Sequence, residues 1–273
     1  MKIRCLISAL VCLLFCFDSP LTAQSSNDNR SIGSTISDDA ATFFSDAGSI
    51  FSSPLHWDQS DILNAHFMIG GTIVSFALDD PARNLAKRNQ SQFGDGLFTF
   101  GREYGRELYG LGLGGGLYLG GLFFRSNDVR ESGMMLVESI AFSGAITTVV
   151  KSLAGRARPY TNEGTIRFHG FTLDESRLSL PSGHVTVAFA VSSTLAARFK
   201  KPLASIALYS LAAVTAASRA YTDDHWFSDT FLAAAIGTTV GMSVVRMHEK
   251  EEEGTSLRVM PTLNGITLVW MLR

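Results

Sequence analysis

The sequence has few cysteines, and all of them lie close to its start. Cys5, Cys12 and Cys16 are the three cysteines in 273 residues. A chain without this segment has no thiol, which excludes disulfide bonds, a cysteine nucleophile and a thiolate metal site. The sequence also lacks an excess of positive charge, because 23 Lys and Arg residues face 25 Asp and Glu residues. No polyanion-binding surface is indicated, so nucleic acid is not an expected partner.

Residues 1–23 are predicted to form a secretory signal peptide. Lys2 and Arg4 precede a short apolar run from Cys5 to Phe17, and cleavage is expected after Ala23. The run is too short to span a bilayer comfortably, as is typical of such signals. A retained signal anchor is the alternative. The protein is therefore expected to be exported, with the bacterial periplasm as its compartment.

Proline is absent from six apolar segments that follow a Ser-, Asp- and Asn-rich lead-in over residues 24–58, which is predicted to be loose or partly helical. Their Ala, Leu, Val and Met content predicts helices. The segments are Ile62–Leu78, Leu108–Phe124, Met134–Val150, Val185–Ala197, Leu203–Ala217 and Phe231–Val245. The fold class is predicted to be all-α, with about six core helices in a domain over residues 59–250. Asn264-Gly265 predicts a small C-terminal β-hairpin over residues 255–273.

Three clusters of polar residues lie at the ends of these segments. The first contains Lys151 and Arg158, which are seven residues apart and are expected on one face of a helix that stops at Pro159. An ammonium group beside a guanidinium group suits a phosphate. Positive flanking of an apolar helix is the alternative explanation.

The second cluster, Pro181-Ser182-Gly183-His184, opens the fourth segment. Gly183 allows a ligand to approach the backbone closely, and the N-terminus of the following helix favours an anion. Ser182 adds a hydroxyl donor, and His184 is placed to protonate a leaving oxygen. An ordinary helix cap has the same residue types.

The third cluster lies between the fifth and sixth segments and contains Arg219, His225 and Asp229. His225 and Asp229 are four residues apart at the start of a helix, which predicts a hydrogen bond between the carboxylate and one imidazole nitrogen. The other nitrogen is then a nucleophile, and Arg219 is a third cation. A capped helix with a surface ion pair is the alternative for this cluster alone. One anion site explains all three clusters together.

The three clusters follow one another in a fixed order of residue types. They read Lys-x6-Arg-Pro, Pro-Ser-Gly-His and Ser-Arg-x5-His-x3-Asp, beginning at Lys151 and ending at Asp229. This order resembles the complete signature of the type 2 phosphatidic acid phosphatase (PAP2) superfamily, which also includes bacterial acid phosphatases and vanadium haloperoxidases. With the surrounding helices, the resemblance extends over roughly residues 62–248.

The resemblance implies a PAP2-type helical bundle and a role for each matching residue. His225 is expected to attack phosphorus, Asp229 to orient it, and His184 to protonate the departing oxygen and then activate water. The residues expected to hold the phosphoryl oxygens are Lys151, Arg158, Ser182, Gly183 and Arg219. No metal ion or other cofactor is expected, and vanadate is expected to inhibit.

The expected function is metal-independent hydrolysis of phosphomonoesters or diphosphates, above all lipid phosphates, through a phosphohistidine. A soluble periplasmic acid phosphatase and a haloperoxidase with vanadate as prosthetic group are the alternatives. The apolar segments run for only 13 to 17 residues, whereas a membrane span needs about 20. Glu138 in the third segment also argues against full embedding. The sequence therefore favours a periplasmic enzyme at a membrane surface, with an integral membrane protein as the alternative.

Overall fold

The computed structural model describes residues 31–252, 255–262 and 265–272, with side chains as far as residue 249. The signal peptide predicted for residues 1–23 lies outside these residues and stays a prediction. Within them, residues 24–58 contribute α2 (Ile32–Ser52), a regular helix where a loose or partly helical segment was expected. Ser31 caps α2 by accepting a hydrogen bond from the Ser34 amide at 3.1 Å.

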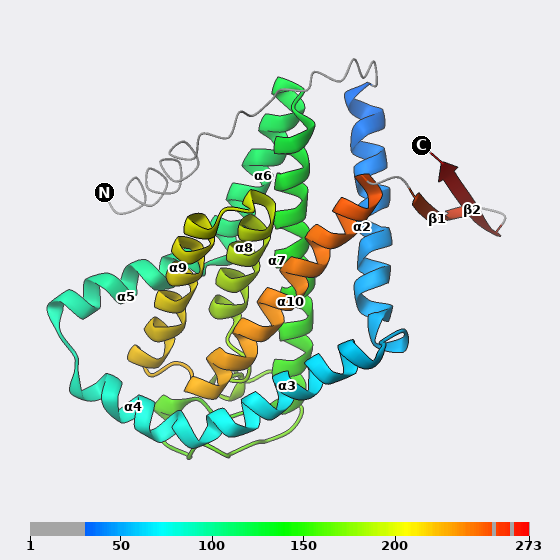
Figure 1. Cartoon of the computed structure of the whole chain (residues 1–273). Coiled ribbons are helices and arrows are strands. Elements are labelled where there is room, and N and C mark those ends of the chain that lie inside the picture. Colours follow the sequence, from blue (N-terminus) through cyan, green and yellow to red (C-terminus); the bar gives the residue numbers. More distant parts are fainter. Residues whose placement is uncertain (1–30, 253–254, 263–264, 273) are drawn as a thin grey trace.

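All six predicted apolar segments are helical. They lie in α3 (Gln59–Ser75) with the following 3₁₀ turn, α6 (Glu107–Phe124), α7 (Asn127–Ala154), α8 (Gly183–Phe199), α9 (Pro202–Tyr221) and α10 (Phe227–Glu252). Two further helices, α4 (Asp79–Arg88) and α5 (Gln92–Tyr104), were not predicted from the sequence, because their polar faces interrupt the apolar runs. Figure 1 shows α3 running across one end of the bundle, with α4 and α5 leading back up its side.

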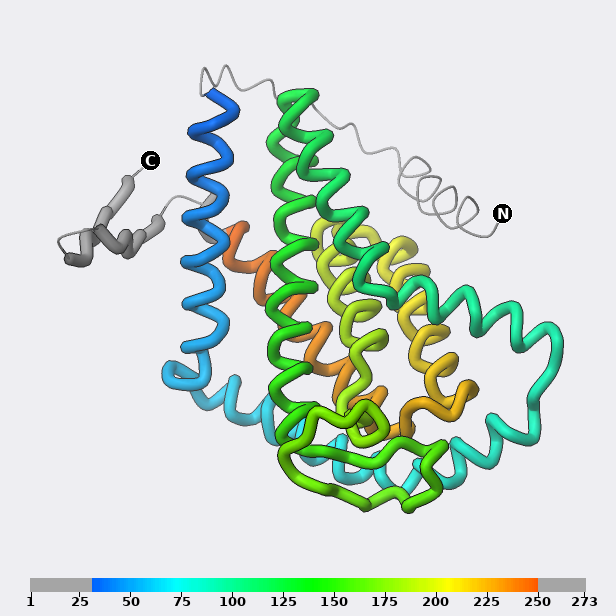
Figure 2. Tube along the Cα trace, turned by 180° about the vertical axis from the view of Figure 1, so that it is seen from behind, coloured from blue at the N-terminus to red at the C-terminus, as the bar shows by residue number. Residues whose placement is uncertain are grey.

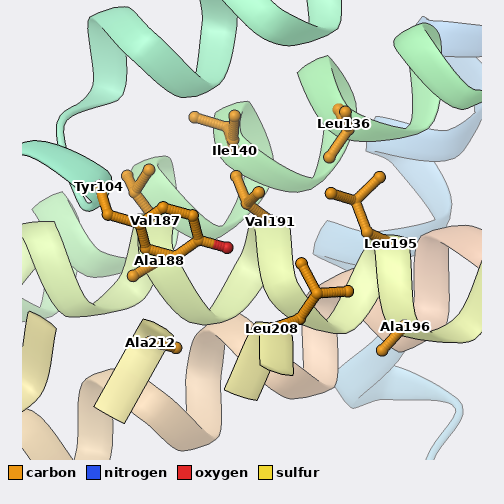
Figure 3. Packing of buried hydrophobic residues seen from close by; sticks show 10 residues of the cluster. All are labelled: Tyr104, Leu136, Ile140, Val187, Ala188, Val191, Leu195, Ala196, Leu208 and Ala212. Atoms are coloured by element: carbon orange, nitrogen blue, oxygen red, sulfur yellow. The ribbon is translucent and has the colours of Figure 1, made fainter. Parts of the chain in front are cut away.

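Helix α8 forms the centre of the bundle, because it packs against α7, α9 and α10. Its side chains are mostly small, so the neighbouring helices approach closely. A core of buried residues surrounds it, and Figure 3 shows Val187, Val191 and Leu195 of α8 between Ile140 of α7 and Leu208 of α9. This packing fixes the ends of α7, α8 and α10 relative to one another.

The glycine-rich helix α6 packs tightly against α7. A Cβ atom on Gly121 would collide with the backbone of Arg130, and one on Gly133 would collide with the backbone of Tyr118. Close packing against α7 therefore accounts for Gly121 of α6, whereas Gly112, Gly115, Gly116 and Gly120 have no atom within 4 Å of an added Cβ.

The segment between α7 and α8 lies across the end of the bundle and has little regular structure. It includes short 3₁₀ turns at Pro159–Thr161 and Glu175–Arg177. Figure 2 shows this segment beneath the ends of the core helices, next to α3.

After α10, the chain continues into β1 (Thr255–Thr262) and β2 (Gly265–Leu272), which pair antiparallel. Residues 263 and 264, at the expected Asn264-Gly265 turn, lie outside the described residues, as do the side chains of both strands. The predicted hairpin motif therefore stays a prediction.

Four helices in the described part of the chain are long and apolar enough to cross a membrane. They are Gln59–Arg88, Asn127–Ala154, Pro202–Tyr221 and Phe227–Glu249. For four of the six segments the expectation that they are too short to span was wrong, because these helices continue past the apolar stretches into polar residues. Helix α7, for example, has 28 residues around a 17-residue apolar stretch.

Candidate active site

A cavity of about 490 Å³ opens where α7 ends and α8 begins. Six of the eight predicted site residues line it: Lys151, Arg158, Gly183, His184, Arg219 and His225. Ser182 and Asp229 are fully buried beside them. The other lining residues come from the turn before α6, from the start of α6 and from α7: Gly105, Arg106, Glu107, Leu108, Gly144, Thr147 and Thr148. The structure thus brings the three sequence clusters to one place.

Lys151 and Arg158 do not share a helix face, so that prediction was wrong. Helix α7 ends at Ala154, because Gly155 has a left-handed φ of +57°. A Cβ atom at this position would also collide with the carbonyl of Gly170, which favours glycine. Arg158 lies beyond the helix in extended backbone. The two cations meet because the chain turns back at Gly155, well before Pro159.

Several buried donor atoms on the predicted site residues have no hydrogen-bond partner within the described structure. They are Nε of Arg158, Nε and Nη1 of Arg219, and Oγ of Ser182. The Nη2 atom of Arg219, by contrast, donates to Asp224 Oδ2 at 2.6 Å. An unsatisfied buried donor costs about 1–3 kcal/mol. Donors gathered in this way on two guanidinium groups and a hydroxyl suit an anion with several acceptor oxygens.

The imidazole of His225 is oriented by a backbone carbonyl. Its Nδ1 atom lies 2.7 Å from the carbonyl oxygen of Ser179. A carbonyl oxygen only accepts hydrogen bonds, so Nδ1 carries the proton and Nε2 carries the lone pair. The Oδ2 atom of Asp229 lies 3.7 Å from Nδ1. The predicted hydrogen bond between Asp229 and His225 was therefore wrong. At this distance the carboxylate interacts with the imidazole electrostatically.

Both site histidines are neutral at pH 7. Burial lowers the pKa of His225 to about 4, and the nearby Lys151 and Arg158 cations act in the same direction against Asp229. Burial also lowers the pKa of His184 to about 4, with the Arg219 cation contributing. A neutral imidazole keeps its lone pair available, which a nucleophile at His225 requires.

Asp229 is held by a buried network that the sequence analysis missed. The Nη1 atom of Arg156 donates to Asp229 Oδ1 at 2.5 Å, and Ser179 Oγ donates to Oδ2 at 2.5 Å. The Nη2 atom of Arg156 donates to Asp79 Oδ2 at 2.7 Å. Both side-chain pairs are fully buried. This network connects α4, the segment after α7 and the start of α10.

Asp229 also joins the second and third clusters. Its Oδ2 atom accepts a hydrogen bond from the Trp226 amide at 2.8 Å, which fixes the turn that carries His225. Its backbone carbonyl accepts from the amide of Ser182 at 3.2 Å, immediately before α8. The residue therefore sets the distance between the helix start at Gly183 and the imidazole of His225.

Comparison with known proteins agrees with the resemblance inferred from the three sequence clusters. Residues 132–253 match the PAP2 superfamily. This part of the chain is a PAP2 superfamily domain. It contains all three clusters, most of α7, and all of α8, α9 and α10.

The PAP2 relatives include a lipid A 1-phosphatase of Porphyromonas gingivalis, which is 27% identical over 237 residues, or 85% of this chain and 48% of the relative. A PA-phosphatase related-family protein of Dictyostelium discoideum is 27% identical over 137 residues, or 45% of this chain and 51% of the relative. The chain thus spans about half the length of these curated relatives. In fold, it is similar to the crystal structure of a transmembrane PAP2-type phosphatidylglycerolphosphate phosphatase from Bacillus subtilis, with a TM-score of 0.54, 19% identity and coverage of 67% of this chain and 94% of that one.

Proposed function

We propose that this protein hydrolyses lipid phosphomonoesters or diphosphates in the cavity, through a phosphohistidine formed on His225. The observation that carries the proposal is the convergence of Lys151, Arg158 and Arg219 on a cavity that is also lined by the neutral imidazole of His225. The PAP2 match and the lipid phosphatases among the relatives support it.

In the first chemical step, Nε2 of His225 attacks phosphorus and the bond from phosphorus to the leaving oxygen breaks. The electron pair leaves with that oxygen, which takes a proton from His184. The bound phosphate raises the proton affinity of His184 through its negative charge, so this imidazole is protonated when substrate is present. The positive charge that develops on the His225 ring is stabilised by the Ser179 carbonyl at 2.7 Å and the Asp229 carboxylate at 3.7 Å.

In the second step, His184 accepts a proton from water and the water oxygen attacks phosphorus. The bond from phosphorus to Nε2 breaks, and its electron pair returns to His225. Negative charge on the phosphoryl oxygens is stabilised in both steps by the three cations and by the start of α8. These groups supply the charge that a metal ion supplies in other phosphatases, so we propose that the reaction needs no metal and that vanadate inhibits it.

Two features favour a lipid as the substrate. Large apolar side chains cover the outward faces of the helices, such as Phe67 on α3, which is 71% exposed, and Phe123 on α6, which is 80% exposed. The cavity also extends from the phosphate ligands along α7 to Gly144 and Thr148. An acyl or prenyl chain can lie along this wall while its phosphate binds at the end of the helix.

The same exposed faces support an integral membrane protein, with the cavity on the outer, periplasmic side. Only 11% of the apolar window in Gln59–Arg88 is buried inside the protein. The end of α8 opposite to the cavity carries Arg198, Lys200 and Lys201. A concentration of positive residues is typical of the cytoplasmic side of membrane proteins, which puts the cavity on the other side.

The test is phosphate release by the full chain in detergent, with phosphatidic acid, a polyprenyl diphosphate and a soluble aryl phosphate as substrates. Release is expected to persist with a chelator in the assay, to be abolished in His225→Ala and to be unchanged in His56→Ala, an exposed histidine outside the cavity. Acid-labile ³²P on the protein is expected in the unmodified chain and not in His225→Ala. Full release by His225→Ala would disprove the mechanism, and a preference for the aryl phosphate would disprove the lipid specificity.

A further inference from the structure

A second cluster of chemically active side chains lies in the interior, away from the cavity. Asp46 of α2, Glu138 of α7 and His248 of α10 are 5%, 0% and 7% exposed. The Nε2 atom of His248 lies 2.8 Å from Glu138 Oε2 and 3.3 Å from Asp46 Oδ2. One ligand atom from each residue lies within 4.8 Å of the others. Buried ionisable groups on apolar helices are costly, so they require a specific partner.

Two buried carboxylates of this cluster face a single imidazole nitrogen, and that nitrogen carries at most one proton. Nε2 can therefore make one short hydrogen bond, which the 2.8 Å distance assigns to Glu138. The Oδ2 atom of Asp46 is buried and has no hydrogen-bond partner among the described residues, although it points to the same nitrogen. An oxygen in this position favours a further positive charge between the three groups.

The donor set and its spacing suit a divalent transition-metal ion. One imidazole nitrogen and two carboxylate oxygens are common zinc ligands, at about 2.0–2.2 Å from the ion. Tetrahedral bonds of that length separate neighbouring donors by about 3.3 Å. The distance from Nε2 to Asp46 Oδ2 is already 3.3 Å. The distance from Nε2 to Glu138 Oε2 must open from 2.8 Å, which follows when the proton between these atoms is replaced by the ion.

We propose that Asp46, Glu138 and His248 bind a structural zinc ion that fastens α2 to α7 and α10. Each of the three helices supplies one ligand, so the ion connects the N-terminal helix to the core. Glu138 and Lys151 are 13 residues apart on α7, or about 20 Å along the helix axis, which separates this site from the cavity. The proposal does not depend on the proposed hydrolysis, because no cavity residue takes part in it.

The test is zinc binding by the full chain, purified in detergent without an affinity tag. After dialysis against Zn²⁺, elemental analysis is expected to find one tightly held zinc per chain. Calorimetry in two buffers of different ionisation enthalpy is expected to show proton release, because Nε2 must lose its proton to bind the ion. Asp46→Asn and Glu138→Gln are each expected to weaken zinc binding by at least about 100-fold, since loss of an outer partner of a ligand alone costs ~10–100-fold.

Matched controls separate this site from general effects. Asp39→Asn removes another carboxylate of α2, which accepts a hydrogen bond from Tyr118 at 2.8 Å, and is expected to leave zinc binding unchanged. His169→Ala removes the imidazole that lies 2.8 Å from Glu163, a pair near the surface where zinc can bind adventitiously, and should also have no effect. The zinc-bound chain is expected to unfold at a higher temperature than the zinc-free chain, and Asp46→Asn is expected to abolish this shift.

His248→Cys provides a test that does not require the native ion pairs. A thiolate binds zinc but cannot replace an imidazolium between two carboxylates, so this variant is expected to retain the metal. With Co²⁺ in place of zinc, it is expected to show a sulfur-to-metal absorption band that the parent chain lacks. Absence of stoichiometric zinc from the parent chain, or equal zinc binding by Asp46→Asn and Glu138→Gln, would overturn the proposal and leave a buried ion triad.

Discussion

The guanidinium of Arg156 donates to the carboxylate of Asp229 at 2.5 Å, and neither side chain is exposed to solvent. The same guanidinium binds Asp79, so two buried carboxylates share one buried cation. Ser228 adds to this arrangement, because its amide donates to Asp79 Oδ1 at 2.8 Å. The start of α10, and with it the turn that carries His225, therefore depends on a residue of α4 that does not line the cavity.

Replacement of Asp79 by Asn is expected to destabilise the protein and slow its reaction. Removal of one charge from a buried pair costs about 3–5 kcal/mol. The phosphate ligands remain, so we expect kcat to fall while KM changes little. The neighbouring Asp80→Asn is the matched control, because Asp80 is exposed, and its effect is expected to stay within about 0.5 kcal/mol. Unfolding curves and steady-state kinetics measure both quantities, and equal results for the two variants would contradict the role of the network.

Arg158→Ala and Arg219→Ala are each expected to lower kcat by about 100-fold, since loss of one donor to a developing oxyanion costs ~10²–10³ in rate. Vanadate inhibition is expected to weaken in parallel, because the same donors bind both anions. Arg167→Ala is the control, since its side chain is 61% exposed and does not line the cavity. Unchanged vanadate inhibition in both cavity variants would show that the anion binds elsewhere.

Stability is expected to fall as the pH drops from about 6.5 to about 4. The pKa of His225 is about 4 in the folded chain, below its ordinary value of 6.5, so the unfolded chain binds a proton in this range that the folded chain does not. Unfolding is therefore favoured as the pH falls, by up to about 3 kcal/mol for His225. His184 acts in the same direction. His225→Gln is expected to flatten the dependence, which unfolding at a series of pH values will measure, and an unchanged slope would contradict the assignment.

Gly144→Leu is expected to distinguish lipid from soluble substrates. A Cβ atom at Gly144 meets no other atom within 4 Å, and the residue lines the cavity at a distance from the phosphate ligands. A leucine there fills the wall along which we place the lipid chain. Turnover of phosphatidic acid is expected to fall by at least about tenfold, which corresponds to ~1.4 kcal/mol, while turnover of an aryl phosphate is retained. Equal losses for both substrates would contradict this path for the chain.

Two glycine substitutions are expected to have opposite effects on stability. A Cβ atom on Gly133 would lie 2.6 Å from the Gly114 carbonyl oxygen, so Gly133→Ala is expected to cost about 1–3 kcal/mol through overpacking. Gly115 has no atom within 4 Å of an added Cβ. Gly115→Ala is therefore expected to stabilise α6 by about 0.5–1 kcal/mol. Thermal unfolding of both variants tests the contact between α6 and α7.

The sequence predicted the convergence of the site well, because its three clusters have residue types that only a shared anion explains together. Lys151, His184 and His225 line one cavity, as expected. The positions of the six apolar helices were also predictable, because their apolar stretches are free of proline, whereas the more polar α4 and α5 were missed. Helix lengths were not predictable, because a hydrogen-bonded helix can continue past its apolar stretch. Helix α7, for example, extends beyond Met134–Val150 at both ends.

The supporting network was not predictable in the same way. Arg156 lies inside the first cluster, two residues before Arg158, and this position is the one signal for it in the sequence. Asp79 is 150 residues before Asp229, and no local spacing relates two such positions. The Ser179 carbonyl could not be inferred either, because a backbone acceptor has no residue type. It is this carbonyl, and not the nearest carboxylate, that determines the tautomer of His225.

Helix α7 is one continuous helix of 28 residues, with Glu138 near its middle and Lys151 in its last turn. Insertion of a single residue between them would rotate one end by about 100° relative to the other. The spacing of this stretch must therefore stay fixed if both the interior cluster and the cavity are to keep their partners. The irregular segment after Pro159 has no helical register to keep, although the carbonyl of its Thr165 accepts hydrogen bonds from Arg156. Changes of chain length among relatives with the same chemistry are expected in that segment on either side of Thr165, and not within α7.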